Sequence, residues 1–331
     1  MKVLFIGGTG LISTACTRLA LQRGIDLYLL NRGERSPDLP AGAKLLRADI
    51  RNPDDVARTI EGMHFDSVVD WICFTREHAE TDLRLFRGKV GQFIFISSAS
   101  AYQKPVTHYL ITESTPLANP YWEYSRNKIL CEEIFTREYR DTGFPSVIVR
   151  PSLTFGPPII PSAFYSWSKP WTLIDRIRKG RPIAVHGDGT SLWVTTHNTD
   201  FAKGLIGLLC HAQSLGHAFH ITTDEVLTWN QIYESVGRAA GVEPKLVHIP
   251  TDFIANHLPE TRGGLLGDKS WSVVFDNTKI KRFVPDFLAT KTLQQGIQES
   301  FDWLNADVSR QGVDESENQK IDGLIAAYLG K

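Results

Sequence analysis

Short β-rich runs alternate with helical patterns through the first 150 residues of the chain. KVLFIGG is followed by LISTACTRLALQRG, and SVVDWI is followed by TREHAETDLRLFRG before the run QFIFISS. Strands that are separated by helices pair in parallel, because only a long crossover returns the chain to the same end of a sheet. Helices then cover both faces of that sheet. The pattern therefore predicts an α/β fold with a doubly wound parallel sheet.

A glycine-rich turn, GGTGLIS, lies directly after the first run and opens the first helical pattern. Gly7 permits a tight turn, and Gly10 lets the backbone approach a pyrophosphate at the positive end of the helix. Ser13 stands where such a turn usually has a third glycine, and its small side chain still allows close packing. The turn predicts a dinucleotide site on a Rossmann-type sheet, and the alternative is an ordinary strand-to-helix connection.

The next run ends in LLNRGER. An acidic residue there would hydrogen-bond the ribose hydroxyls of NAD, but the chain has Asn31, followed by Arg32 and Arg35. Guanidinium groups pair bidentately with phosphate, so the two arginines favour NADP over NAD, unless they belong to a solvated basic loop. Asp49, in RADIRN, is placed to meet the adenine edge, although it could equally cap the next turn. The expected cofactor-binding residues are Gly7, Gly10, Leu11, Ile12, Asn31, Arg32, Arg35, Asp49, Ile50 and Pro151.

After Pro151 the alternation gives way to irregular segments that carry proline, glycine and tryptophan, such as FGPPIIPSAFYSWSKPW. Irregular stretches inside a compact chain are usually functional. We expect a dinucleotide-binding domain over residues 1–150 and a smaller, irregular α/β part over residues 151–304, which mainly binds substrate and could return some segments to the first sheet. A polar linker and a terminal helix are expected over residues 305–331.

The chain of 331 residues has a formal net charge of −1 and no long run of one sign. The sequence therefore lacks the clustered positive charge of a protein that binds nucleic acid or an anionic membrane. The N-terminus has no pattern of a signal peptide, and no apolar stretch approaches the length of a membrane span. Four widely spaced cysteines without a CxxC pair indicate reduced thiols and no metal site. These features predict a cytoplasmic protein that acts on a small molecule.

A tyrosine and a lysine stand four residues apart in YSRNK, inside a segment that is expected to be helical. Residues at this spacing share one face of a helix, so the pair alone could belong to an ordinary polar face. FISSASAY precedes it and RPSLTFGP follows it. With the GGTG turn, this order resembles the extended short-chain dehydrogenase/reductase superfamily, which includes the NAD-dependent epimerases and dehydratases of nucleotide sugars. The likeness covers nearly the whole chain and implies the catalytic set Ser98, Tyr124 and Lys128.

The resemblance also assigns roles to this set. Tyr124 would be the acid/base that moves the hydroxyl proton, Lys128 would hold the nicotinamide ribose, and Ser98 would hydrogen-bond the reacting oxygen. Free tyrosine has a pKa of about 10, which a lysine ammonium and an oxidised nicotinamide would lower. Ser98 is preferred to Ser97 because it lies four residues before Tyr102, the spacing of the family, and adjacent strand residues point to opposite faces.

The segments SVVDWICFTREHAETDLRLF and QFIFISSASAYQKP are similar to an atypical branch of the superfamily, which contains the chloroplast stem-loop RNA-binding proteins and their bacterial relatives. Plant members of that branch are associated with RNA. An RNA-associated protein on the same fold is therefore an alternative of another class. The intact Tyr124 and Lys128, and the lack of a basic surface, favour the enzyme.

Two departures from the family's motifs narrow the range of reactions and substrates that are expected. Ala99 and Ser100 occupy the positions of the Asp-Glu pair that drives water elimination in the dehydratases, so a 4,6-dehydratase is disfavoured. An ungapped alignment of HGDGTSLWVTTHNTDFA places Trp193 where nucleotide-sugar enzymes have an arginine that binds the substrate diphosphate. Such a replacement is not conservative, although a tryptophan face can still stack on a base or a sugar.

Three residues are candidates for contact with substrate. Trp193 could stack on the substrate or belong to the core. His197 could be a second acid/base or a structural histidine, and Arg262 could be a second phosphate ligand or an exposed loop residue.

The sequence thus predicts an NAD(P)-dependent oxidoreductase of the epimerase/dehydratase type, which acts on a hydroxyl or carbonyl of a sugar or sugar-nucleotide-like substrate. A carbonyl reductase or dehydrogenase that exchanges its cofactor and uses a non-nucleotide substrate is the alternative among enzymes. The resemblance is also compatible with a homodimer that forms through the helix of Tyr124.

Overall fold

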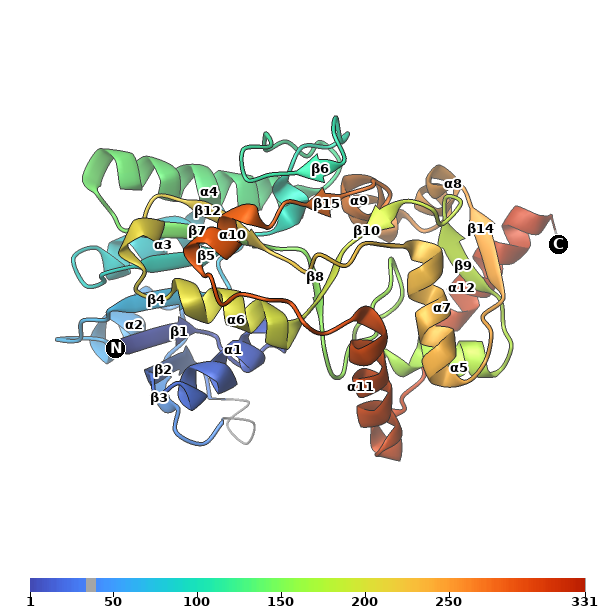
Figure 1. Cartoon of the computed structure of the whole chain (residues 1–331), viewed down its shortest axis with the longest axis horizontal. Helices are drawn as coiled ribbons and strands as arrows, with labels where there is room; N and C mark the ends of the chain where they lie inside the picture. Colours follow the sequence, from blue (N-terminus) through green and yellow to red (C-terminus); the bar gives the residue numbers. More distant parts are fainter. Residues whose placement is uncertain (34–39, 331) are drawn as a thin grey trace.

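The computed structural model describes residues 1–33 and 40–330. Within these residues, seven parallel strands form the main sheet, and the chain reverses its direction of travel across that sheet between β1 and β4 (Figure 1). In spatial order the strands are β12 (Ala218–Ile221), β7 (Ser146–Pro151), β5 (Phe93–Ile96), β4 (Ser67–Asp70), β1 (Lys2–Ile6), β2 (Asp26–Asn31) and β3 (Lys44–Arg47). The predicted doubly wound α/β fold is confirmed. A reversal of strand order opens a crevice at the carboxyl ends of the strands, where ligands of such sheets bind.

Strand β1 shows why the sheet is covered on both faces. Val3 and Phe5 pack against α1 (Leu11–Gln22) and α6 (Asn198–Leu208). Leu4 and Ile6 point to the other face and pack with residues of the remaining covering helices. Those helices are α2 (Pro53–Thr59), α3 (Arg76–Phe86) and α4 (Glu123–Thr142). An apolar strand without alternation is what a parallel sheet between two helical layers requires.

The face that carries α1 is completed by segments far along the chain. Helix α6 packs directly on α1, and β12 pairs with β7 in parallel register from Ala218 opposite Ile148 to Ile221 opposite Pro151. Helix α10 (Thr278–Phe283) adds Ile280 to the same apolar cluster. Residues well beyond 150 are therefore part of the main sheet and its cover.

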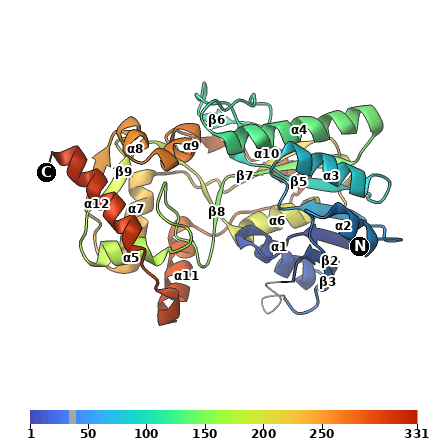
Figure 2. The same ribbon diagram turned by 180° about the vertical axis from the view of Figure 1, so that it is seen from behind.

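The rest of the chain forms a second part beside the main sheet, with its own apolar cluster, and Figure 2 shows the C-terminus at the far end of this part from the N-terminus. Its strands form small pairs: β8 (Leu153–Phe155) with β11 (Thr195–His197), β9 (Ile183–His186) with β14 (Leu246–Ile249), β10 (Leu192–Trp193) with β13 (Leu227–Thr228), and β6 (Leu110–Ile111) with β15 (Val274–Phe275). Its helices are α5 (Trp171–Arg178), α7 (Trp229–Ala240), α8 (Thr251–His257), α9 (Arg262–Gly264), α11 (Leu293–Asn305) and α12 (Glu315–Leu329). Short 3₁₀ turns lie at Ala99–Ala101, Ala212–Ser214, Pro259–Thr261 and Val308–Arg310, and a π-helix spans Leu265–Lys269.

The terminal helix differs from the expectation. The polar stretch 305–320 was expected to be a linker, but α12 begins inside it at Glu315. The side chain of Asp314 accepts a hydrogen bond from the main-chain N–H of Glu317 at 3.1 Å and caps the helix. Asn318 is buried against the guanidinium of Arg176, so a polar residue here belongs to an interface and not to solvent. In the described residues, no helix has the length and apolar character needed to cross a membrane.

Candidate active site

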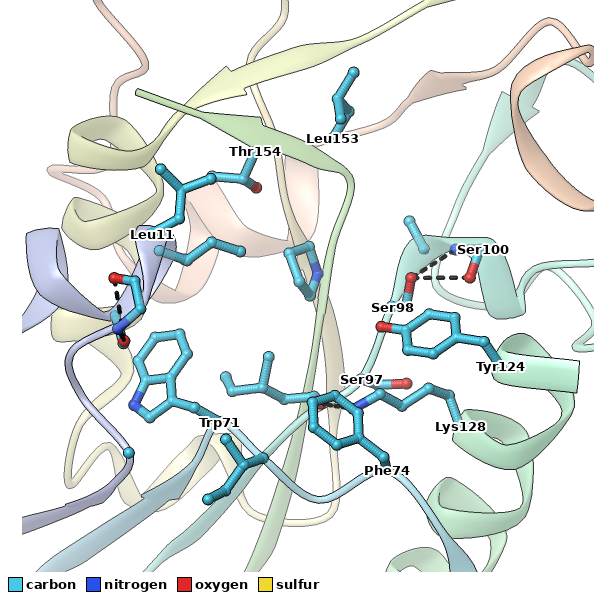
Figure 3. A pocket seen from close by; sticks show the side chains of 18 of the residues that line it. Leu11, Trp71, Phe74, Ser97, Ser98, Ser100, Tyr124, Lys128, Leu153 and Thr154 are labelled. Atoms are coloured by element: carbon cyan, nitrogen blue, oxygen red, sulfur yellow. Dashed lines mark hydrogen bonds between the residues drawn. The ribbon is translucent and has the colours of Figure 1, made fainter. Parts of the chain in front are cut away.

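A cavity of about 1100 Å³ lies at the carboxyl ends of the central strands, between the main sheet and the second part. It is lined by the turn after β1, by the ends of β2, β4 and β5, and by residues of α4 and of the segment 264–275. This is the crevice that the strand order opens. Figure 3 shows Leu11 and Trp71 on one side of it, and Tyr124 and Lys128 on the other.

Positive backbone angles shape the glycine turn. Gly7 has φ +100° and Gly8 has φ +93°, a region that side chains with a Cβ rarely adopt. A Cβ on Gly8 would lie 2.7 Å from Cδ2 of Leu29. Thr17 Oγ1 donates a hydrogen bond to the Gly8 carbonyl at 2.9 Å, and the Gly10 N–H donates to Ser13 Oγ at 2.8 Å. The serine in place of a third glycine thus ties the turn to the first turn of α1.

Nine of the ten expected cofactor residues line this cavity, and Arg35 lies outside the described residues. The nine are Gly7, Gly10, Leu11, Ile12, Asn31, Arg32, Asp49, Ile50 and Pro151. The Asn31 side chain accepts a hydrogen bond from the Gly33 N–H at 2.8 Å. Asp49 accepts one from the Arg51 N–H at 2.9 Å, so it caps the turn and faces the cavity at once. That these residues bind a cofactor stays a prediction.

Tyr124 occupies the first turn of α4 because the chain before the helix is fixed. Asn119 Oδ1 accepts hydrogen bonds from the N–H groups of Tyr121 at 3.2 Å and Trp122 at 3.1 Å, where the helix begins. The Tyr124 hydroxyl is directed towards Ser98 (Figure 3). Ser98 Oγ lies 2.9 Å from Ser100 Oγ, to which Ser125 donates a hydrogen bond at 2.8 Å. A chain of hydroxyl groups therefore fixes Ser98 beside Tyr124.

The neighbouring serine points elsewhere, as the alternation along a strand predicts. Ser97 Oγ donates a hydrogen bond at 2.5 Å to the buried carboxylate of Glu132. That carboxylate also pairs with Arg150 at 2.6 Å. Ser97 therefore belongs to a buried ionic network, whereas Ser98 joins the group around Tyr124.

Lys128 lies one helical turn after Tyr124 and is only 1% exposed. Its ammonium donates hydrogen bonds to the main-chain carbonyl groups of Cys73 at 2.6 Å and Ile96 at 2.7 Å. An ammonium has three N–H donors, so one remains for a ligand. Nζ also lies 4.5 Å from the ring centroid of Phe74 and 5.8 Å from that of Tyr124. The ends of β4 and β5 thus hold the cation in place.

The surroundings of Tyr124 shift its pKa in the protein by itself. Burial raises the pKa of Tyr124, the hydrogen bond with Ser98 opposes this, and the charge of Asp268 raises it further. Burial also lowers the pKa of Lys128. The expected lowering of the Tyr124 pKa depended on Lys128 and on a cationic nicotinamide together. In the protein by itself, burial outweighs the hydrogen bond with Ser98, so the pKa of Tyr124 lies above its ordinary value.

The three candidates for contact with substrate lie in different places relative to the cavity. Trp193 lines the cavity but is 2% exposed, with its ring centroid 5.5 Å from that of Trp229, so most of its surface is core. His197 does not line the cavity: its ring packs edge-on against Phe155 and caps α6. Burial lowers the pKa of His197 to about 4. The structure therefore does not bring His197 to the site.

Arg262 is also absent from the cavity wall. It begins α9 as an exposed residue, and the helical turns that follow direct Asp268 and Lys269 inward instead. These two residues and Lys104 line the cavity together with Trp122, and the sequence did not reveal them as site residues. The available clues were the segment QKP, directly after SSASAY, and the segment GDKS, shortly after Arg262.

The sequence suggested no metal site, yet a cluster of donor groups lies behind Lys128. The donor atoms of Asp70, Cys73 and Asp82 are buried and lie within 4.8 Å of one another. Burial and the neighbouring charge of Asp70 raise the pKa of Asp82 well above its usual value. The cation of Lys128 lies near this cluster and offsets part of its negative charge.

Comparison with protein families matches residues 3–222 to the NAD dependent epimerase/dehydratase family. The match spans more than half of the chain, which therefore belongs to this family of NAD-dependent enzymes. This confirms the resemblance that the motifs carry.

Two relatives and one solved structure illustrate the range of similar proteins. The chain is 26% identical to 2'-dehydrokanamycin reductase of Streptomyces kanamyceticus, over 87% of this chain and 80% of that protein. It is 25% identical to the chloroplast stem-loop binding protein of 41 kDa b of Arabidopsis thaliana, over 76% and 67%. An epimerase structure from Methanothermobacter thermautotrophicus has a TM-score of 0.77 and 16% identity, with 93% of both chains covered, which shows the common fold.

Proposed function

We propose that the protein is an NAD(P)-dependent oxidoreductase that interconverts a carbonyl and a hydroxyl group of a sugar-like substrate at Ser98, Tyr124 and Lys128. The observation that carries the proposal is the convergence of these three side chains on the cavity that the glycine turn also lines. The hydroxyl of Tyr124 points to Ser98, and the ammonium of Lys128 is fixed one helical turn away.

The residues present fit a nicotinamide dinucleotide. Gly7 and Gly8 leave a side-chain-free surface at the N-terminus of α1, where main-chain N–H groups and the helix dipole favour a pyrophosphate. The remaining N–H of Lys128 suits a ribose hydroxyl. Arg32 lines the cavity after the end of β2, and a guanidinium in this position would suit the 2′-phosphate of NADP, which supports NADP as the preferred form. When bound, the cofactor supplies hydride transfer.

The side chains supply the proton and the orientation. Tyr124 gives its proton to the carbonyl oxygen in reduction, or accepts the hydroxyl proton in oxidation. Ser98 donates a hydrogen bond to the same oxygen, while Ser100 and Ser125 hold Ser98 in place. Burial raises the pKa of Tyr124, so the phenol carries the proton that reduction of a carbonyl consumes.

A reductase or dehydrogenase that exchanges its cofactor fits better than an epimerase of nucleotide sugars. The position of the diphosphate-binding arginine is taken by the buried Trp193, and Arg262 lies outside the cavity wall. One relative is named 2'-dehydrokanamycin reductase. Denaturing the purified protein and analysing the released nucleotide by mass spectrometry tests this choice. Little bound cofactor is expected, and a stoichiometric oxidised cofactor would favour the epimerase.

Replacing Tyr124 by phenylalanine tests the assignment of the acid. The loss of the hydroxyl should lower kcat by roughly 10²- to 10⁴-fold, because general acid catalysis contributes about that much. The measurement is oxidation of NADPH or NADH with a panel of keto-sugars. Tyr121→Phe, which changes a tyrosine outside the cavity wall on the same segment, is the matched control and should retain activity.

Thermal unfolding and cofactor titration of Tyr124→Phe should match the unmodified protein. Full turnover in this variant would contradict the proposed mechanism. If neither nicotinamide cofactor binds the unmodified protein but structured RNA does, the RNA-associated alternative, which similarity to the chloroplast protein keeps open, would replace the enzyme.

A further inference from the structure

Two segments outside the Ser/Tyr/Lys set bring charged side chains to the cavity wall beside Tyr124. One is the chain after the end of β5, which contributes Lys104. The other is the π-helix Leu265–Lys269, which contributes Asp268 and Lys269. The charge of Asp268 acts on both Lys104 and Tyr124, so all these groups belong to one local site.

Lys104 is a buried cation with little support from the protein. It is 3% exposed, and its ammonium donates one long hydrogen bond, of 3.3 Å, to the Tyr102 carbonyl. Among residues 1–33 and 40–330, no carboxylate forms an ion pair with it, and no other acceptor bonds to it. Burial lowers the pKa of Lys104, and the charge of Asp268 opposes this. A buried ammonium in this state lacks partners for two of its three N–H groups.

The π-helix holds the second ammonium in a fixed position. The main-chain carbonyl of Lys269 accepts hydrogen bonds from His186 Nε2 and Trp229 Nε1, both at 3.0 Å. Its ammonium lies 3.4 Å from Asp268 Oδ2 and 5.6 Å from the ring centroid of Trp122. The side chains of Lys269 and Asp268 are 11% and 17% exposed. A π-helical turn inside a chain often marks a functional site.

These three side chains leave a positive charge without a partner. Lys269 pairs with the carboxylate of Asp268, whereas Lys104 has no ion-pair partner among the described residues, in a wall that is largely shielded from water. We propose that the substrate carries a carboxylate, which binds Lys104 and Lys269 while its carbonyl or hydroxyl group meets Tyr124. This inference rests on the proposed function and names the substrate class. A single negative charge balances the site, whereas a phosphate dianion would leave an excess negative charge in a buried place.

The aromatic part of the wall favours a ring that bears this carboxylate. Trp122 packs on Tyr124, with ring centroids 4.9 Å apart, and Trp167 also lines the cavity. Glycines at 263 and 267 make room for Trp122, because a Cβ there would lie 2.4 Å and 2.8 Å from its side chain. Such indole faces stack on a sugar ring or an aromatic ring. A sugar acid and an aromatic acid both combine a ring with a carboxylate, and the binding experiment distinguishes these two classes of ligand.

The test is a binding titration of the full-length protein in saturating NADP⁺, followed by tryptophan fluorescence and calorimetry. D-glucuronate and benzoate are the probes, with D-glucose and benzyl alcohol as uncharged partners and glucose 6-phosphate as a dianion. At least one carboxylate should bind more tightly than its uncharged partner. Lys104→Met should weaken that carboxylate by roughly ten- to a hundredfold, since a hydrogen bond to a charged group contributes about that factor. Binding of the uncharged compounds should stay unchanged.

Further variants distinguish a failed inference from a failed fold or function. Lys104→Arg keeps the charge and should retain part of the preference. Lys269→Met should lose it, because Asp268 then neutralises Lys104. Lys320→Met, on the exposed face of α12, is the matched control and should behave as the unmodified protein. NADP⁺ affinity and thermal unfolding of Lys104→Met report independently on cofactor binding and folding.

Equal carboxylate affinity in the unmodified protein and Lys104→Met would overturn the inference. Failure of both carboxylates to bind, or tighter binding of the phosphate ester, would overturn it as well. These results leave the roles of Tyr124 and the cofactor untouched, because those are measured by turnover and by cofactor titration.

Discussion

Single side chains in the cavity depend on partners from other elements. Lys128 is carried by α4, but its ammonium is positioned by carbonyl groups of Cys73 and Ile96, which follow or end β4 and β5. A guanidinium is planar and cannot reproduce the three-way geometry of an ammonium, so arginine is not a conservative replacement here. Helix α4 thus carries the lysine, and carbonyl groups at the ends of two sheet strands fix the position of its ammonium.

Arg32 is the residue on which cofactor choice is expected to depend. Replacement by alanine should reduce the affinity for NADPH by roughly tenfold or more, because a charge-assisted hydrogen bond to phosphate is lost. The affinity for NADH should change little. Titration of both cofactors by fluorescence measures the ratio. Arg23→Ala, at the exposed end of α1, is the control and should leave it unchanged. An unchanged NADPH-to-NADH ratio in Arg32→Ala would contradict the NADP preference.

The sequence predicted the surroundings of some residues and not of others. The choice of Ser98 over Ser97 followed from its spacing to Tyr102 in the family's motif, and strand alternation predicted that only one of the two faces the site. The structure separates the two serines in that way. Arg262 does not line the cavity, because a helical turn and a π-turn follow it and bring residues six and seven positions later to the wall. The number of turns in an irregular segment depends on its packing, here around Trp122, which one sequence does not reveal.

The turn between β1 and α1 needs glycine both for its backbone angles and for the space around it. Gly8→Ala should destabilise the protein and weaken cofactor binding, because its φ is +93° and the new Cβ would lie 2.7 Å from Leu29. Gly24→Ala is the matched control, since Gly24 also has a positive φ, +71°, but its Cβ would meet no atom within 4 Å.

The control should cost about 1 to 2 kcal/mol of unfolding free energy, the usual cost of a left-handed residue, without loss of cofactor affinity. Urea unfolding and NADP⁺ titration of both variants measure the difference. Equal losses of stability and unchanged cofactor binding would show that close packing at Gly8 is unimportant.

Elements of the main sheet were the most predictable part of the chain. Their strands are short apolar runs between helices, and the parallel order follows from that alternation. The start of α12 was not predicted, because its first turns are polar and are stabilised by the Asp314 cap and by contact with Arg176. Polar residues at a tertiary contact have no hydrophobic period to reveal them.

At the scale of the whole molecule, His186 links strand β9 to the π-helix at the cavity and makes folding sensitive to acid. Burial lowers the pKa of His186 to about 4, against about 6.5 in an unfolded chain. The unfolded state therefore binds the proton first as the pH falls. Stability that is present above pH 6.5 is lost between about pH 6.5 and 4, by roughly 3 kcal/mol at the lower end.

His186→Gln should make this part of the stability profile less steep, which urea unfolding at a series of pH values measures. His248→Gln changes an exposed histidine on the paired strand β14 and should keep the slope of the unmodified protein. If His186→Gln and the unmodified protein lose the same free energy between pH 6.5 and 4, the buried neutral ring is not responsible.

The late return of α6 and β12 to the main sheet has a consequence for how the protein is made. The apolar side of α1 and the free edge of β7 are covered by residues near 198–221, far from residue 22, where α1 ends. At about 5–20 residues per second, a ribosome needs roughly 10 to 40 s to add the segment between them. The edge of β7 stays unpaired for the later part of this interval, from the synthesis of Pro151 until β12 is complete at Ile221. A chaperone that binds nascent chains would compete there with mispairing between neighbours on a polysome.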